Sequence, residues 1–63
     1  MKFSKNLQEL RNSKKLSQEQ LAEKIGVSRQ AISSWESGKT LPEIDKVAEI
    51  CKVFEISSSE LLG

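Results

Sequence analysis

The sequence predicts an all-α protein, folded as a compact bundle of five short helices. Apolar residues recur three or four positions apart along the chain, and no segment alternates apolar and polar residues for long enough to predict a strand. Serine-led capping signals and breaks at Gly26, Gly38 and Pro42 divide this pattern into five segments. Because 63 residues with 37% hydrophobic side chains can close only one small core, we expect a single domain over residues 1–63.

The first two helices are predicted from an apolar stripe followed by a capping motif. We expect the first helix over about residues 4–14. In the motif Ser17-Gln18-Glu19-Gln20, the serine hydroxyl accepts from a backbone N–H and Gln20 reaches back, so a second helix begins there. Gly26 ends it, because glycine adopts the left-handed conformation at little steric cost. The inward residues of the two helices are Phe3, Leu7, Leu10, Leu21, Ala22 and Ile25.

A third helix follows almost without a linker. Ser28 lies two residues beyond Gly26 and is an N-cap candidate, so two short helices meet there at a sharp angle. The third helix turns Ile32 and Trp35 inward, one turn apart, and ends at Gly38. This junction is the most informative feature of the sequence.

The fourth and fifth helices are predicted from a proline and a second capping box. Pro42 suits the first turn of a helix, where its missing N–H is harmless. Ser57-Ser58-Ser59-Glu60 caps a final short helix that contributes Leu61 and Leu62. On the fourth helix, the expected inward face comprises Ile44, Val47, Ala48, Cys51 and Phe54.

Composition excludes several classes of function. Cys51 is the only cysteine and there is no histidine, so one chain holds no disulfide framework, Cys/His metal site or histidine-based catalytic relay. We therefore expect no metal, no cofactor, no small-molecule ligand and no enzymatic activity. No run approaches the ~20 apolar residues of a membrane span, and the first residues contain no apolar signal region. The expected location is the cytoplasm, away from membranes.

The charges are unevenly distributed along the chain. Residues 1–42 hold eight lysines and arginines against four glutamates, a net charge of +4. Residues 43–63 hold two lysines against five acidic residues, a net charge of −3. Such a distribution suits a protein that presents a basic face to a polyanion, although ordinary solvated charge explains it equally well.

The segment from Gln18 to Ser37 has the pattern of a helix-turn-helix motif. Ala22 is small because the two helices cross closely there, and Gly26 makes the turn. Suitable residues at so many fixed offsets are a stronger signal than any single short motif. The wedge between the two helices is filled by Leu21, Ile25, Val27, Ile32 and Trp35.

On these residues the chain resembles the phage-repressor/Cro-type helix-turn-helix proteins, the XRE-like family. The resemblance extends to Leu7, Leu10 and Arg11 before the motif, and to residues 35–39, Pro42 and residues 54–62 after it. It implies a lambda-repressor-like five-helix DNA-binding domain. Such domains are usually dimeric on DNA and regulate transcription in bacteria and their phages.

The third helix carries the residues expected to contact bases. At about 100° per residue, the face opposite Ile32 and Trp35 is entirely polar, and Arg29 lies at its margin near the N-terminal end. An arginine can grip guanine O6 and N7, and a glutamine adenine N6 and N7, with two hydrogen bonds each. Arg29 and Gln30 are therefore the leading base contacts, and the resemblance adds Ser33 and Ser34. A merely solvated helix face is the competing interpretation.

Phosphate contacts are expected from elements that flank the third helix, because such contacts position a protein without specifying sequence. The start of the second helix offers free N–H groups, a positive dipole end and the Gln18 amide. The loop after the third helix offers one cation and two hydroxyls, and Ser28 joins them although it is primarily a cap. The predicted phosphate contacts are Gln18, Ser28, Ser37, Lys39 and Thr40.

Three further residues are assigned structural roles. The resemblance implies an ion pair between Arg11 and Glu36 that links the first helix to the end of the third. Its energetic weight depends on whether the pair is exposed or buried, which the sequence leaves open. Trp35 could stack on a base, but its inward position favours a place in the core.

We expect a homodimer on a near-palindromic operator, with half-site centres ~34 Å apart. Because few cations flank the third helix, one half-site would bind weakly. The dimer interface is expected in the C-terminal region, which holds more apolar side chains than a small core needs. The predicted interface residues are Phe54, Ile56, Leu61 and Leu62.

The predicted function is sequence-specific double-stranded DNA binding by a transcriptional regulator, most simply a repressor. The alternative is a protein-interaction module, such as an antitoxin-like or assembly subunit with secondary DNA binding. Substitution of Arg29 and Gln30 separates the two, because it should abolish DNA recognition and leave partner capture intact.

Overall fold

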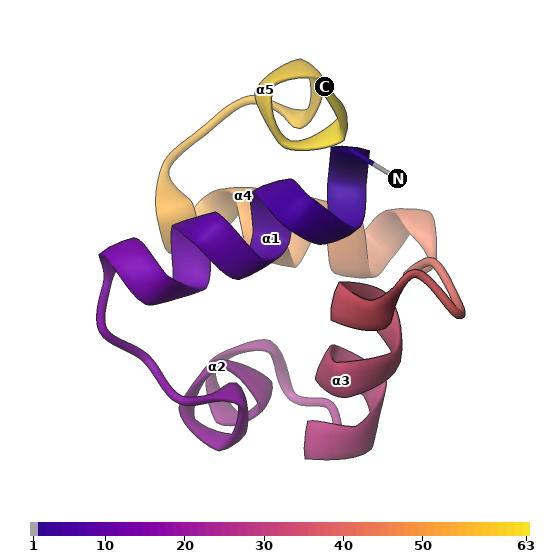
Figure 1. Ribbon diagram of the computed structural model, residues 1–63. Helices are drawn as coiled ribbons and strands as arrows, with labels where there is room; N and C mark the ends of the chain where they lie inside the picture. The colour runs from indigo at the N-terminus through magenta and orange to yellow at the C-terminus, as the bar shows by residue number, and fades with distance from the viewer. Residues whose placement is uncertain (1) are drawn as a thin grey trace.

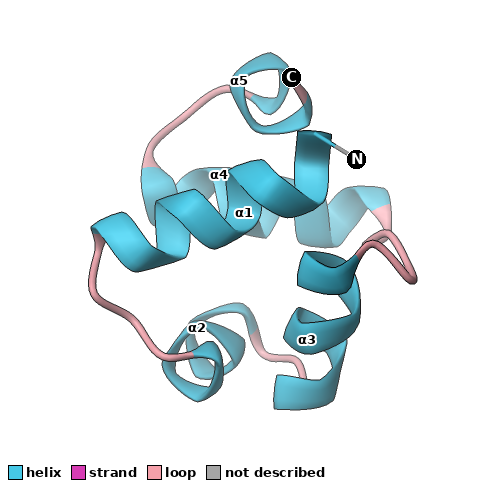
Figure 2. Cartoon of the chain, in the orientation of Figure 1, coloured by secondary structure: helices cyan, strands magenta, loops and turns pink. Residues whose placement is uncertain are grey.

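The computed structural model describes residues 2–63 as five helices joined by short loops. Within these residues there is no β-strand, and Figure 2 shows only helices and loops. The elements are α1 (Lys2–Ser13), α2 (Gln18–Ile25), α3 (Arg29–Ser37), α4 (Ile44–Phe54) and α5 (Ser58–Leu62). In Figure 1, α1 crosses the middle of the molecule, with α2 and α3 on one side of it, α5 on the other and α4 behind. The predicted all-α five-helix fold is therefore confirmed.

Each of the five helices contributes buried side chains to one hydrophobic core. Leu7, Leu21, Ile32, Ile50 and Leu61 are the largest fully buried side chains, and they come from α1 to α5 in turn. Because every helix is short, none could bury its apolar face without the others. The remaining core residues are Phe3, Ala22, Ile25, Trp35 and Phe54.

Local capping chemistry sets most helix ends where the sequence places them. Ser17 and Ser57 form complete capping boxes with Gln20 and Glu60. The Ser28 hydroxyl accepts a hydrogen bond from the Ala31 N–H at 3.1 Å. These contacts satisfy N–H groups that have no acceptor within the first helical turn.

The start of α4 differs from the prediction. Pro42 lies before the helix, and Glu43 occupies the N-cap position without a side-chain hydrogen bond to the backbone. Asp45 is the acidic residue of the first turn, where it complements the positive end of the helix. Proline is compatible with the extended backbone before a helix as well as with its first turn, so the residue type alone does not place the boundary.

The buried face of α4 also differs from the prediction. Ile44 and Ala48 were expected inward, but Ile44 is 88% exposed and Ala48 is also exposed. The buried residues are Ile50 and Phe54, with Val47 and Cys51 half-buried beside them. Apolar side chains occupy a wider part of the surface of α4 than the other helices cover. The apolar periodicity therefore predicted the wrong residues for the middle of its buried face.

Two residues assigned to a dimer interface lie instead in the core of the single chain. Phe54 is 4% exposed and Leu61 is fully buried. Their side chains have no surface to offer a second protomer, so that part of the prediction is wrong. Ile56 is half-buried, and Leu62 is 52% exposed.

Candidate DNA interface

The turn between α2 and α3 is closed by backbone hydrogen bonds around Gly26. Gly26 has φ 85°, in the left-handed region, and its N–H donates to the carbonyl of Ala22 at 2.8 Å. The N–H of Val27 donates to the same carbonyl at 3.0 Å, and the Val27 side chain packs against the core. Two hydrogen bonds to one carbonyl end α2 sharply, so only three residues, 26–28, separate α2 from α3.

The two faces of α3 are clearly separated. Ile32 is fully buried and Trp35 is 6% exposed, so this side of the helix faces the core. On the opposite side Arg29 and Gln30 are exposed, as is Ser37 near the C-terminal end. Ser33 and Ser34 are half-buried on the same polar side. The structure thus gathers the residues predicted for base contact on the accessible side of one helix.

A buried carboxylate holds α3 against α1 and α2. Arg11 donates from Nε to Glu36 Oε2 at 2.6 Å and from its second terminal nitrogen to Oε1 at 3.1 Å. Its remaining terminal nitrogen donates to the backbone carbonyl of Leu16 at 2.7 Å. The side chains are 12% exposed for Arg11 and 4% exposed for Glu36. The ion pair implied by the resemblance is therefore present, and the structure shows that it is bidentate and largely shielded from water.

Gln18 makes a further contact with this ion pair, and the sequence did not predict that contact. Its side-chain amide donates to Glu36 Oε1 at 3.1 Å. The amide nitrogen carries a second hydrogen, which remains available to a phosphate oxygen. Glu36 therefore orients the first residue of α2, and nothing in the spacing of the two residues signals that contact.

The other predicted phosphate contacts lie at the two ends of α3. The Ser28 hydroxyl accepts from the backbone and can still donate, whereas the Ser37 hydroxyl donates to the Ser34 carbonyl at 3.0 Å. Beyond Ser37, backbone N–H groups of Lys39 and Thr40 donate to the Ser34 carbonyl at 3.0 and 3.4 Å. Both side chains are exposed. The loop backbone is therefore held in place while its cation and hydroxyl remain accessible.

Two features are absent from residues 2–63. No group of three or more His, Cys, Asp or Glu side chains in this range could hold a metal ion. Over the same range, no helix combines the length and apolar character needed to cross a membrane. The accessible polar side of α3 is the surface on which the predicted base contacts lie.

Comparison with known families agrees with this geometry. A family model described as "Helix-turn-helix" matches residues 7–61, which is most of the chain. The chain belongs to the phage-repressor, XRE-type helix-turn-helix family. Members of this family are DNA-binding transcription regulators, and the α2–α3 unit of this chain is its helix-turn-helix.

Named relatives and solved structures resemble this helix-turn-helix protein over nearly its full length. The HTH-type transcriptional activator BcrR of Enterococcus faecalis is 52% identical over 63 residues, all of this chain and 31% of BcrR. The SOS-response transcriptional repressor LexA from Eubacterium rectale has a TM-score of 0.93 at 32% identity, covering 98% of this chain and 66% of that structure. The restriction-modification controller protein C.AhdI from Aeromonas hydrophila has a TM-score of 0.87 at 33% identity, covering 95% and 91%.

The lengths of these relatives differ from that of this chain. It spans about a third of BcrR and about half of two other curated HTH-type transcriptional regulators, both from Bacillus subtilis. The likeness therefore concerns the helix-turn-helix unit that the chains share.

Proposed function

We propose that this protein binds double-stranded DNA sequence-specifically with α3 in the major groove and regulates transcription from that site. One observation carries the proposal: the accessible side of α3 presents Arg29 and Gln30, two side chains suited to bidentate contact with purines. Both lie at the N-terminal end of the helix, which enters the groove first in helix-turn-helix complexes. Ser33 and Ser34 supply shorter hydrogen-bonding groups farther along the same side.

The flanking contacts position this helix on the backbone. Phosphate oxygens are acceptors, and the second amide hydrogen of Gln18 and the hydroxyl of Ser28 are free to donate to them. Lys39 and Thr40 would contact the backbone beyond the C-terminal end of α3. The Ser37 hydroxyl already donates to the Ser34 carbonyl, so it has no hydrogen left for a phosphate oxygen. Because Gln18 also contacts Glu36, the phosphate contact and the orientation of α3 are mechanically linked.

We further propose a homodimer on a near-palindromic operator with half-site centres ~34 Å apart. Few cations flank α3, so a second subunit is needed for tight binding at physiological salt. A two-fold protein dimer matches a palindromic site, because each subunit then meets the same half-site sequence. Repression is the simplest outcome, because a bound domain excludes RNA polymerase from overlapping DNA. The relative BcrR, by contrast, is named as a transcriptional activator.

Selection from random duplex DNA tests the proposal. We expect inverted repeats with a guanine or adenine at the positions that Arg29 and Gln30 face. On the selected site, Arg29→Ala and Gln30→Ala should each weaken binding about 5- to 150-fold, the equivalent of roughly 1–3 kcal/mol per bidentate contact. Circular dichroism should show an unchanged fold, because both side chains are exposed.

Lys46→Ala is the matched control, because it removes a cation from α4 instead of α3. It should leave both affinity and the selected sequence nearly unchanged. Pools without enrichment, or equal losses of affinity on specific and random DNA, would contradict the proposal and favour a protein-interaction module.

A further inference from the structure

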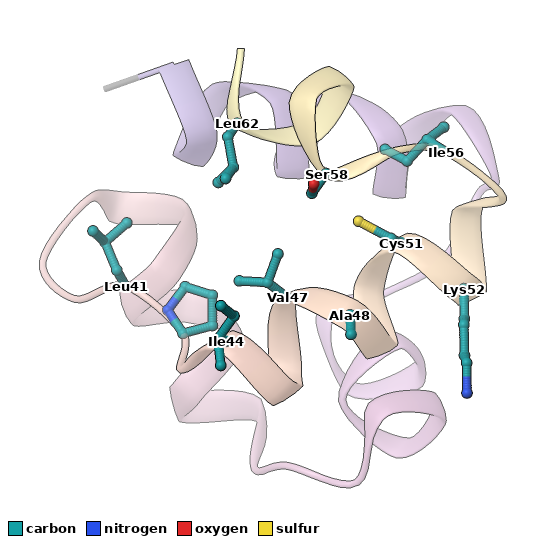
Figure 3. Close-up of a pocket in the computed structure, with 10 residues that line it drawn as sticks. Leu41, Ile44, Val47, Ala48, Cys51, Lys52, Ile56, Ser58 and Leu62 are labelled. Atoms are coloured by element: carbon teal, nitrogen blue, oxygen red, sulfur yellow. The ribbon is translucent and has the colours of Figure 1, made fainter.

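An apolar hollow lies between α4, α5 and the loop before α4, on a surface separate from the polar side of α3. It has a volume of about 670 Å³ and is lined mainly by carbon atoms. Figure 3 shows Leu41, Ile44, Ala48 and Leu62 around it, together with Cys51. Leu41 is 56% exposed and Ile44 is 88% exposed, so the monomer leaves large apolar side chains in water. Such a contiguous apolar patch marks an interaction surface.

The exposed side of α4 has a definite arrangement. Ile44, Ala48 and Lys52 follow one another at intervals of four residues, so they form a row along the solvent side of the helix. Ala48, in the middle of this row, is exposed and small, which permits another backbone to approach closely. The opposite side of the helix is buried through Ile50 and Phe54.

Two opposite charges lie on either side of Ala48 along this helix. Asp45 and Lys52 are seven residues apart, so they lie on almost the same line of the helix, ~10 Å from each other. Both side chains are exposed, and neither has an ion-pair partner within residues 2–63. They lie on either side of Ala48, one nearer each end of the helix.

We propose that a second copy of this chain packs on the hollow, with the two α4 helices antiparallel and crossing at Ala48. A two-fold axis near Ala48 places Lys52 of each protomer opposite Asp45 of the other, so two ion pairs form at once. Parallel helices would instead oppose Asp45 to Asp45 and Lys52 to Lys52. This charge complementarity identifies the occupant as an antiparallel copy of the same helix.

The apolar and charged residues have different roles in this interface. Leu41, Ile44 and Leu62 supply the area removed from water, which drives association. The exposed ion pairs contribute little affinity, but they select the antiparallel direction because the alternative brings like charges together. Ile56, at the far end of the hollow, extends the apolar contact.

The inference deepens the homodimer of the proposed function and rests on it, but its test needs no DNA. Dimerisation of the full chain is measured by sedimentation equilibrium at low salt. Asp45→Lys and Lys52→Asp should each weaken the dimer about tenfold or more, because each puts like charges across the axis. The double variant carrying both reversals should return to within about threefold of the unmodified chain.

Glu23→Lys is the matched control for charge, because Glu23 is an exposed carboxylate on α2. It should change the dimer affinity less than about twofold. Failure of the double reversal to restore dimerisation would overturn the antiparallel arrangement. A chain that remains monomeric at ~1 mM, a concentration that reveals even weak association, would overturn the interface altogether.

A cross-linking experiment gives a second, independent readout. In a Cys51→Ser background, Ala48→Cys should form a disulfide-linked dimer under mild oxidation, because the two introduced thiols meet near the axis. Glu23→Cys in the same background should remain largely uncross-linked. If Ala48→Cys cross-links no faster than Glu23→Cys, the crossing point is wrong. If the dimer forms but no DNA sequence is selected, the result counts against the proposed DNA binding and leaves the dimer interface standing.

Discussion

The carboxylate of Glu36 joins α3 to α1 and α2 through three side-chain hydrogen bonds. It accepts from two nitrogens of Arg11 and from the amide of Gln18, and only 4% of its side chain is exposed. Glu36 on α3 is thereby linked directly to α1 and to the start of α2. Because Arg11 also donates to the Leu16 carbonyl, the loop after α1 belongs to the same network. The orientation of the polar side of α3 depends on this network.

Glu36→Ala should lower the free energy of unfolding by about 3–5 kcal/mol, because it leaves the largely buried Arg11 guanidinium without its counter-charge. Urea denaturation followed by circular dichroism measures the change. Glu23→Ala, which removes an exposed carboxylate from α2, is the control and should change stability by less than about 0.5 kcal/mol. A similar small change for both variants would show that the pair behaves as a surface salt bridge.

Residue types alone predicted part of this site. The polar side of α3 was predicted because side chains repeat every 3.6 residues, so Ile32 and Trp35 define the opposite side. The contact between Gln18 and Glu36 was not predictable, because it joins two helices whose separation depends on packing. Equally, the hydroxyl of Ser37 was assigned to phosphate although it already donates within its own helix.

Among the elements, the α2–α3 turn depends most strongly on a single backbone conformation. Gly26 has a positive φ, and a Cβ built on it would meet no atom within 4 Å. The need for glycine is therefore conformational and not a matter of space.

Gly26→Ala should lower stability by about 1–2 kcal/mol, because an L-residue resists the left-handed region. Gly26→Asn should lose less, since asparagine tolerates that conformation. Thermal and urea unfolding of the two variants provide the comparison. Equal stability of Gly26→Ala and the unmodified protein would show that the turn can adopt another conformation without cost.

Helix starts were predicted well where a side chain makes the cap, as at Ser17, Ser28 and Ser57. The start of α4 was placed too early because Glu43, at its N-cap, makes no side-chain cap contact. The buried side of α4 was also misplaced, since Ile44 and Ala48 are apolar but lie on the exposed surface. Periodicity identifies an apolar stripe, but it does not say whether a core or a second molecule covers it.

At the scale of the whole molecule, the two differently charged segments of the sequence form different helices. The basic segment, residues 1–42, contains α1, α2 and α3, and the acidic segment contains α4 and α5. Figure 1 places α5 on the opposite side of α1 from α2 and α3. Under the proposed function, a phosphate backbone at α3 would lie across α1 from α5, whereas α4, the other helix of the acidic segment, packs against α2.

The salt dependence of DNA binding should reflect this arrangement. With about 3 phosphates neutralised per subunit, the logarithm of the affinity of a dimer should fall against the logarithm of salt concentration with a slope of about −5. Under the proposed function Lys39 contacts one phosphate per subunit, so Lys39→Gln should make the slope shallower by about 2. Fluorescence anisotropy across a salt series measures both values.

Lys46→Gln serves as the control for this series, because Lys46 lies on the acidic segment. It should leave the slope unchanged. Identical slopes for Lys39→Gln and the unmodified protein would remove Lys39 from the phosphate contacts.

The sequence by itself determined the helical class, the number of helices, the caps and turn that join α2 to α3, and the polar composition of the α3 surface. These properties follow from local backbone chemistry and from the helical repeat, which act over a few residues. Only the tertiary structure decided that Phe54 and Leu61 are core residues, that Glu36 is buried with Arg11 and Gln18, and that one apolar side of α4 faces water. Burial depends on which helices pack together, and that choice is made by contacts between residues distant in the chain.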